Sequence, residues 1–189
     1  MSTHRHLTND LEYVGGLLRK SERGTSPFGV YLLWAGMVLV GFSLVDFAPQ
    51  RVGLFWFIGG PLGGVLSAFL GHRYAVRIGQ VNRAEGIRHG WHWSGVMLAI
   101  LLAVPLGVTG AVDWRILSRV FLLLIGLAYF LAGVHLEKPL KWAGLLMMAG
   151  YVALFFIPAY GWTLVGALVA ATLVVSGLLE RRRAAAPIR

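Results

Sequence analysis

The stretch FGVYLLWAGMVLVGFSLV, from Phe28 to Val45, contains no Asp, Glu, Lys, Arg or His. An α-helix rises 1.5 Å per residue, so about 20 apolar residues are needed to cross the roughly 30 Å hydrocarbon core of a bilayer. The run is continuously apolar and lacks the period-two alternation of a barrel strand. It therefore predicts a transmembrane helix.

Five further stretches of the same kind follow, which gives six predicted spans at 28–47, 53–71, 92–111, 116–135, 139–158 and 161–179. The whole chain of 189 residues is 57% hydrophobic and 13% charged, whereas a soluble domain carries roughly a quarter charged residues. We expect an all-α polytopic membrane protein with a leader (1–27), a six-helix transmembrane domain (28–180) and a basic tail (181–189).

Lys and Arg are distributed unequally between the two sides of these spans. The leader, the 72–91 segment, the short segment near 138 and the tail carry fourteen of them, and the segments on the other side carry three. Because basic residues accumulate on the cytoplasmic side of a membrane, both termini are predicted to be cytoplasmic. The net charge of +9 is interpreted as this topology signal plus contacts with anionic headgroups, and not as nucleic-acid binding.

The leader is predicted to contain a short amphipathic helix. Leu7, Leu11, Val14 and Leu18 recur at helical spacing, and basic residues cluster near the end of the segment. Such a helix can lie on the membrane surface, dock under the bundle or bind a partner.

Short signatures recur along the spans and suggest three successive two-helix hairpins. The first, third and fifth spans carry Trp34-Ala35-Gly36, Trp93-Ser94-Gly95 and Trp142-Ala143-Gly144. The second, fourth and sixth carry small residues seven apart: Gly64 and Gly71, Gly126 and Gly133, Ala170 and Gly177. Because Gly and Ala are abundant in this chain, chance recurrence is the alternative.

The stretch Leu145-Leu146-Met147-Met148-Ala149-Gly150, continuing through Pro158 to Val175-Ser176-Gly177-Leu178-Leu179, resembles the repeat of HdeD-type small bacterial membrane proteins. The whole chain also resembles other bacterial membrane proteins without an assigned activity, whose first span carries a motif like Ser26-Pro27-Phe28-Gly29-Val30-Tyr31. These resemblances imply a six-helix inner-membrane protein with, at most, a stress-related role. They imply no catalytic residue.

The second span carries two rows of small residues at a spacing of four. One row is Gly59, Gly63, Ser67 and Gly71, and the other is Gly60, Gly64 and Ala68. Small residues at this spacing let helix backbones approach closely, so we expect a packing helix, with Gly63 and Gly64 at a close contact. Packing inside the monomer is favoured over a homodimer seam or a gate.

Four histidines, His72, His89, His92 and His135, fall at the predicted cytoplasmic boundary. Imidazoles bind zinc, copper or iron, and Glu85 or Glu137 would complete a shell. The alternative is a set of dispersed interfacial rings beside Trp91 and Trp93. Dispersal is favoured, because a metal site needs second-shell acceptors and this basic face offers few.

No predicted span has an ionisable residue at mid-depth, where a proton or ion pathway would require one. Asp46 and Arg119 fall near the outer ends, and with Arg51, Asp113 and Arg115 they are expected to form surface ion pairs. No nucleotide-binding or hydrolase motif is present, and without cysteine there is no thiol chemistry.

The sequence therefore favours a non-enzymatic inner-membrane protein with a structural, lipid-binding or partner-binding role, homo-oligomerisation included, and without a cofactor. A small transporter or channel is the first alternative. A metal-dependent membrane enzyme built on the four histidines is the second.

Overall fold

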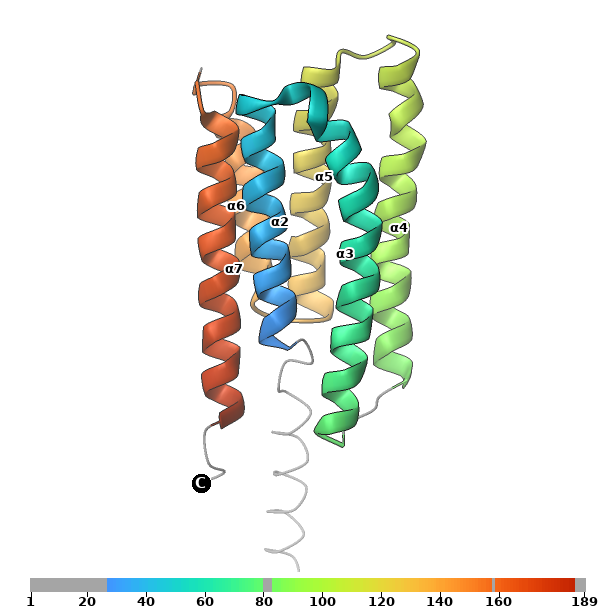
Figure 1. Ribbon diagram of the computed structural model, residues 1–189, viewed down its shortest axis with the longest axis vertical. Helices are drawn as coiled ribbons and strands as arrows, with labels where there is room; N and C mark the ends of the chain where they lie inside the picture. Colours follow the sequence, from blue (N-terminus) through green and yellow to red (C-terminus); the bar gives the residue numbers. More distant parts are fainter. Residues whose placement is uncertain (1–26, 80–82, 158, 186–189) are drawn as a thin grey trace, which may run out of the picture.

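The computed structural model describes residues 27–79, 83–157 and 159–185, with side chains as far as Arg182. The described chain is helical, and its elements are α2 (Phe28–Phe47), α3 (Pro49–Arg77), α4 (Arg83–Val108), α5 (Trp114–His135), α6 (Leu140–Ala153) and α7 (Gly161–Ala185). The predicted leader helix lies outside these residues. Successive helices run in opposite directions, so the described chain begins and ends at the same end of the bundle, the lower end in Figure 1.

Five of these six helices are long and apolar enough to cross a membrane, which fits an integral membrane protein. The exception is α6, with 14 residues. A helix of that length spans only about 21 Å. The predicted span 139–158 is therefore too long: turns follow Ala153, although the chain stays apolar. Ile157 precedes Pro158, and the residue before a proline is disfavoured in the helical region.

The 72–91 segment, between the second and third predicted spans, is helical over most of its described residues. Helix α3 continues to Arg77, and α4 already begins at Arg83. Hydropathy reports where a helix is embedded in lipid, and basic residues with good helix propensity extend both helices beyond that region. Pro61 and Pro105 lie inside α3 and α4 without ending either helix.

The helices are neighbours in the order α3, α2, α7, α6, α5, α4. The most extensive packing joins α2 to α7 and α5 to α6, so the first and last described helices are adjacent (Figure 1). By contrast, no Cα atom of α3 comes within 8 Å of a Cα atom of α4 among the described residues.

Glycines bring α5 and α6 into backbone contact. A Cβ added at Gly144 of α6 would lie 2.6 Å from the carbonyl oxygen of Gly126, and one added at Gly133 would overlap the backbone of Lys141. In the α2–α7 pair, glycines of α7 receive side chains instead: Gly166 receives Phe42 and Gly177 receives Tyr31. Close approach of this kind replaces the hydrophobic driving force that is missing between helices in lipid.

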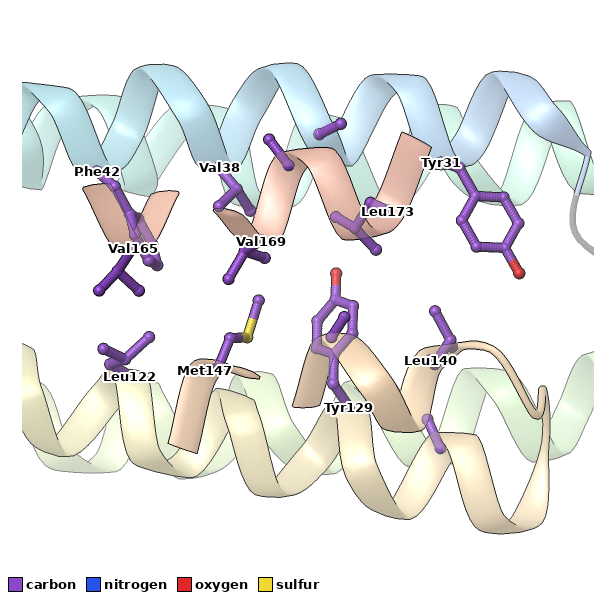
Figure 2. Packing of buried hydrophobic residues seen from close by; sticks show 14 of the residues in the cluster. Tyr31, Val38, Phe42, Leu122, Tyr129, Leu140, Met147, Val165, Val169 and Leu173 are labelled. Carbon is purple, nitrogen blue, oxygen red and sulfur yellow. The ribbon is translucent and has the colours of Figure 1, made fainter. Parts of the chain in front are cut away.

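The buried core lies between these two helix pairs, as Figure 2 shows. Phe42 and Val38 of α2 point toward the α5–α6 pair from one side, and Leu122 and Met147 face them from the other. Because α3 and α4 flank this core, the most apolar stretches of these two helices are the least buried among the five long helices.

Candidate functional site

The most unusual polar group in the structure is Glu137, whose side chain is buried in the short connection between α5 and α6. It is 3% exposed. The turn that holds it is tight: its backbone N–H donates to the carbonyl of Ala132, and its own carbonyl accepts from the N–H of Leu140. Removing an ionised carboxylate from water is costly unless it is paired and hydrogen-bonded.

Tyr31 supplies a hydrogen bond to this carboxylate. Its hydroxyl donates to Oε2 of Glu137 at 3.0 Å, and both side chains are buried. Tyr31 stands on the first turn of α2, and its ring packs against Gly177 of α7. The bond therefore links the α2–α7 pair to the connection that closes the α5–α6 pair.

His89 of α4 approaches the other carboxylate oxygen. Its Nε2 lies 4.0 Å from Oε1 of Glu137, and its side chain is 23% exposed. The Nε2 atom is itself buried and has no hydrogen-bond partner among the described residues. A separation of 4.0 Å is too long for a hydrogen bond, but it is within the range of an ion pair.

One turn after His89, His92 and Trp93 of α4 contact α5. Nε2 of His92 lies 3.1 Å from the carbonyl oxygen of Ala128, within hydrogen-bond distance. The Trp93 ring packs edge-on against Tyr129, with centroids 5.1 Å apart. Together with His89, these residues form a line of contacts that holds the first half of α4 against the core.

This cluster does not lie at the extreme end of the bundle. His89 is six residues beyond the first residue of α4, which places it about 9 Å along the helix. The α5–α6 connection and the start of α2 both end short of the lower ends of α3, α4 and α7 (Figure 1). Glu137 is thus an ionisable group that faces helices of membrane-spanning length.

A second polar contact closes the opposite end of the α2–α7 pair. Oδ2 of Asp46 accepts hydrogen bonds from both the backbone N–H and the hydroxyl of Thr163, each at 2.7 Å. The negative charge stands at the N-terminus of α7, where the helix dipole favours it. Asp46 thus caps a helix 117 residues away along the chain.

The expected surface ion pairs at this end are not formed among the described residues. Asp113 instead caps α5 by accepting from the backbone N–H of Arg115, and the Arg119 guanidinium lies over the Phe155 ring. Backbone N–H groups at helix starts compete for these carboxylates, a competition that charge spacing in the sequence does not reveal.

The four candidate metal ligands take different positions. His89 and His92 lie at the α4–α5 contacts described above, whereas His72 on α3 and His135 at the end of α5 are exposed. Within the part of the chain that the structure describes, no three His, Cys, Asp or Glu side chains form a group that could hold a metal ion. From the proposed shell, the structure places His89 beside Glu137, with Nε2 and Oε1 4.0 Å apart.

The small residues of α3 divide into two surfaces. Gly59, Gly63 and Ser67 face α2: Met37 fills the space beside both glycines, and the Trp34 indole donates to the Ser67 hydroxyl at 2.9 Å. In the other row, Gly60 is buried near Met97 of α4, while Gly64 is exposed, with nothing within 4 Å of an added Cβ. Gly71 is also open by this measure.

Sequence reasoning missed the central role of Glu137 and Tyr31. A signal was available, since Glu137 is the only acidic residue between Asp113 and Glu180. The sequence pattern suggests Glu137 only as part of a metal shell, and the three-dimensional structure shows that Tyr31, 106 residues earlier, is its hydrogen-bond partner.

Replacing Tyr31 with Phe should destabilise the bundle, because the buried carboxylate of Glu137 would lose a hydrogen-bond donor. We expect a loss of about 1–3 kcal/mol, measured as a lower melting temperature of the purified protein in detergent. Tyr160→Phe is the matched control, since Tyr160 is 63% exposed. Equal melting temperatures for the two variants would contradict the role assigned to Tyr31.

Comparison with known proteins yields no relative. No protein-family description, curated protein or solved structure matches the chain. The function must therefore be argued from the arrangement of these residues.

Proposed function

We propose that the chain is an integral protein of the bacterial inner membrane, with both termini in the cytoplasm, and that it acts without catalysis by binding other membrane components. The bacterial assignment rests on the sequence resemblance described above. The binding role rests on α3, a helix of membrane-spanning length that packs closely on one neighbouring helix and leaves a second surface open.

The distribution of basic residues supports the orientation. The ends of α3 and α7 and the starts of α4 and α6 all lie at the lower end in Figure 1, and they carry most of the basic residues among those described. Several of these cations lie over aromatic rings, as Lys141 does over Trp142 and Arg181 over Phe28. Aromatic rings and basic side chains gather at membrane interfaces, where the cations attract anionic headgroups.

A periplasm-active reporter tests this orientation. Fused after Arg189 it should be inactive, and fused after Pro49, at the opposite end of α2, it should be active, because the basic segments stay in the cytoplasm. Activity at Arg189 together with silence at Pro49 would reverse the orientation.

The observation that carries the binding proposal is the open surface at Gly64. In α3 the row Gly59–Gly63–Ser67 is filled by side chains of α2, whereas the turned-away face at Gly64 and Ala68 is exposed. Lipid chains do not require glycine on a helix surface, but another helix that approaches closely does. We propose that α3 of a second copy packs on this surface.

Two neighbouring glycines make the test specific. The side chain of Gly64→Leu would begin in open space within the same protomer, because nothing lies within 4 Å of an added Cβ, so the melting temperature of the protomer should stay unchanged. The same side chain should abolish the dimer, because it would block the close approach of the second copy. Gly63→Leu is the contrasting variant: its Cβ would lie 2.8 Å from Sδ of Met37, so the protomer itself should lose about 1–3 kcal/mol of stability through overpacking.

The readouts are native mass spectrometry for the oligomer and thermal unfolding for the protomer. A wild-type protein that is monomeric when released from lipid nanodiscs would contradict the proposal. A Gly64→Leu protein that remains dimeric would contradict it as well.

A small proton-linked transporter is the second candidate. The buried Glu137 carboxylate favours it. Ionisable groups that are buried among membrane-spanning helices mark proton and ion pathways, and Glu137 lies in the connection between α5 and α6, beside His89 of α4. A proton flux into proteoliposomes that the wild-type protein supports and Glu137→Gln abolishes would establish transport. Proteoliposomes that stay impermeable to protons with either protein would exclude it.

A further inference from the structure

Helix α4 is held to the rest of the bundle by few contacts. Among the described helices, α4 packs closely on α5, and the most apolar stretch of α4 is the least buried among the five long helices. Its first half is attached through His89, His92 and Trp93, as described above. A change in any of these contacts therefore changes how α4 is held.

Of these three contacts, only the one at His89 involves a charged partner. The carboxylate of Glu137 is buried and fixed by the turn around it and by the Tyr31 hydroxyl. The imidazole of His89 faces it across 4.0 Å with a buried Nε2 that has no hydrogen-bond partner among the described residues. A protonated imidazole is attracted to an ionised carboxylate at this distance, whereas a neutral one is attracted much less.

Other ionisable groups surround the pair. Tyr31 reaches it from α2, and Glu180 of α7 and Tyr129 of α5 are close enough to interact electrostatically with Tyr31. Lys138 and Lys141 follow Glu137 in the chain, and Glu85 and Arg88 are neighbours of His89 on α4. Imidazole is the side chain in this group that ordinarily changes charge between pH 5 and 8.

We infer that His89 and Glu137 form a proton-binding site that fastens α4 to the core: uptake of one proton by His89 converts a weak contact into an ion pair. No bond other than that to the proton forms or breaks, and the proton comes from water. The inference is independent of the dimer proposed for α3, because it concerns residues of a single chain.

The direction of the effect follows from the charges. While Glu137 is ionised, the attraction is present when His89 is protonated, and it is lost as the pH rises and the imidazole becomes neutral. Replacing His89 should therefore cost more stability at pH 5.5 than at pH 8. The chain contains five other histidines, so the comparison requires a variant that removes one of those instead.

The experiment measures the melting temperature of the full chain in nanodiscs at pH 5.5 and pH 8. We expect His89→Gln to lower it by about 2–4 °C more at pH 5.5 than at pH 8, a shift of the size that one weak ion pair gives in a protein of this length. His135→Gln, at an exposed position at the end of α5, should show no such difference. In a Glu137→Gln background, the pH-dependent cost of His89→Gln should disappear.

An equal loss at both pH values would overturn the inference, and so would a His89→Gln protein that fails to fold at either pH, because the histidine would then be required whatever its charge. Persistence of the pH-dependent cost in the Glu137→Gln background would assign the effect to a different partner.

Discussion

The close approach of helices at glycine is the constraint on which this structure depends. Between membrane helices there is no hydrophobic driving force of the kind that folds a soluble domain, so packing and polar contacts must hold the bundle. Gly126, Gly133 and Gly144 let α5 and α6 meet at their backbones, while Gly166 and Gly177 let α7 receive side chains of α2. The core fills the space between these two pairs, and α3 and α4 are attached outside it.

Polar contacts join these helices at both ends of the α2–α7 pair. Asp46 ties the end of α2 to the start of α7, and at the other end Tyr31 ties the α2–α7 pair to Glu137 in the connection between α5 and α6. Each bond satisfies a buried or partly buried polar group that would be costly to leave unpaired. The Glu137 carboxylate accepts a hydrogen bond from Tyr31 of α2 and also lies 4.0 Å from His89 of α4, so it contacts both the core and a helix outside it.

The sequence predicts the helical, membrane-spanning class well, because runs such as Phe28–Val45 have few alternatives once backbone groups must be satisfied in lipid. It predicts helix ends less well: hydropathy does not mark where α3 leaves the membrane, and it does not show that α6 stops at Ala153. It also does not distinguish Gly64, which is open, from Gly133, which meets a backbone. Whether a glycine lies at a close helix contact depends on how helices that are distant in the sequence pair with one another. The hydrogen bond between Tyr31 and Glu137 depends on the same helix pairings.

The pairing of α2 with α7 brings the two ends of the described chain together, and it positions Tyr31 for its hydrogen bond to Glu137. The chain has no cysteine, so Phe42→Cys combined with Gly166→Cys introduces one thiol on each helix where α2 and α7 touch. Mild oxidation in intact membranes should join them within one chain, and a protease site placed between α2 and α7 would reveal the link as fragments that separate only after reduction. Fragments that separate without reduction, while each single-cysteine protein is folded and inserted, would contradict the arrangement of helices described above.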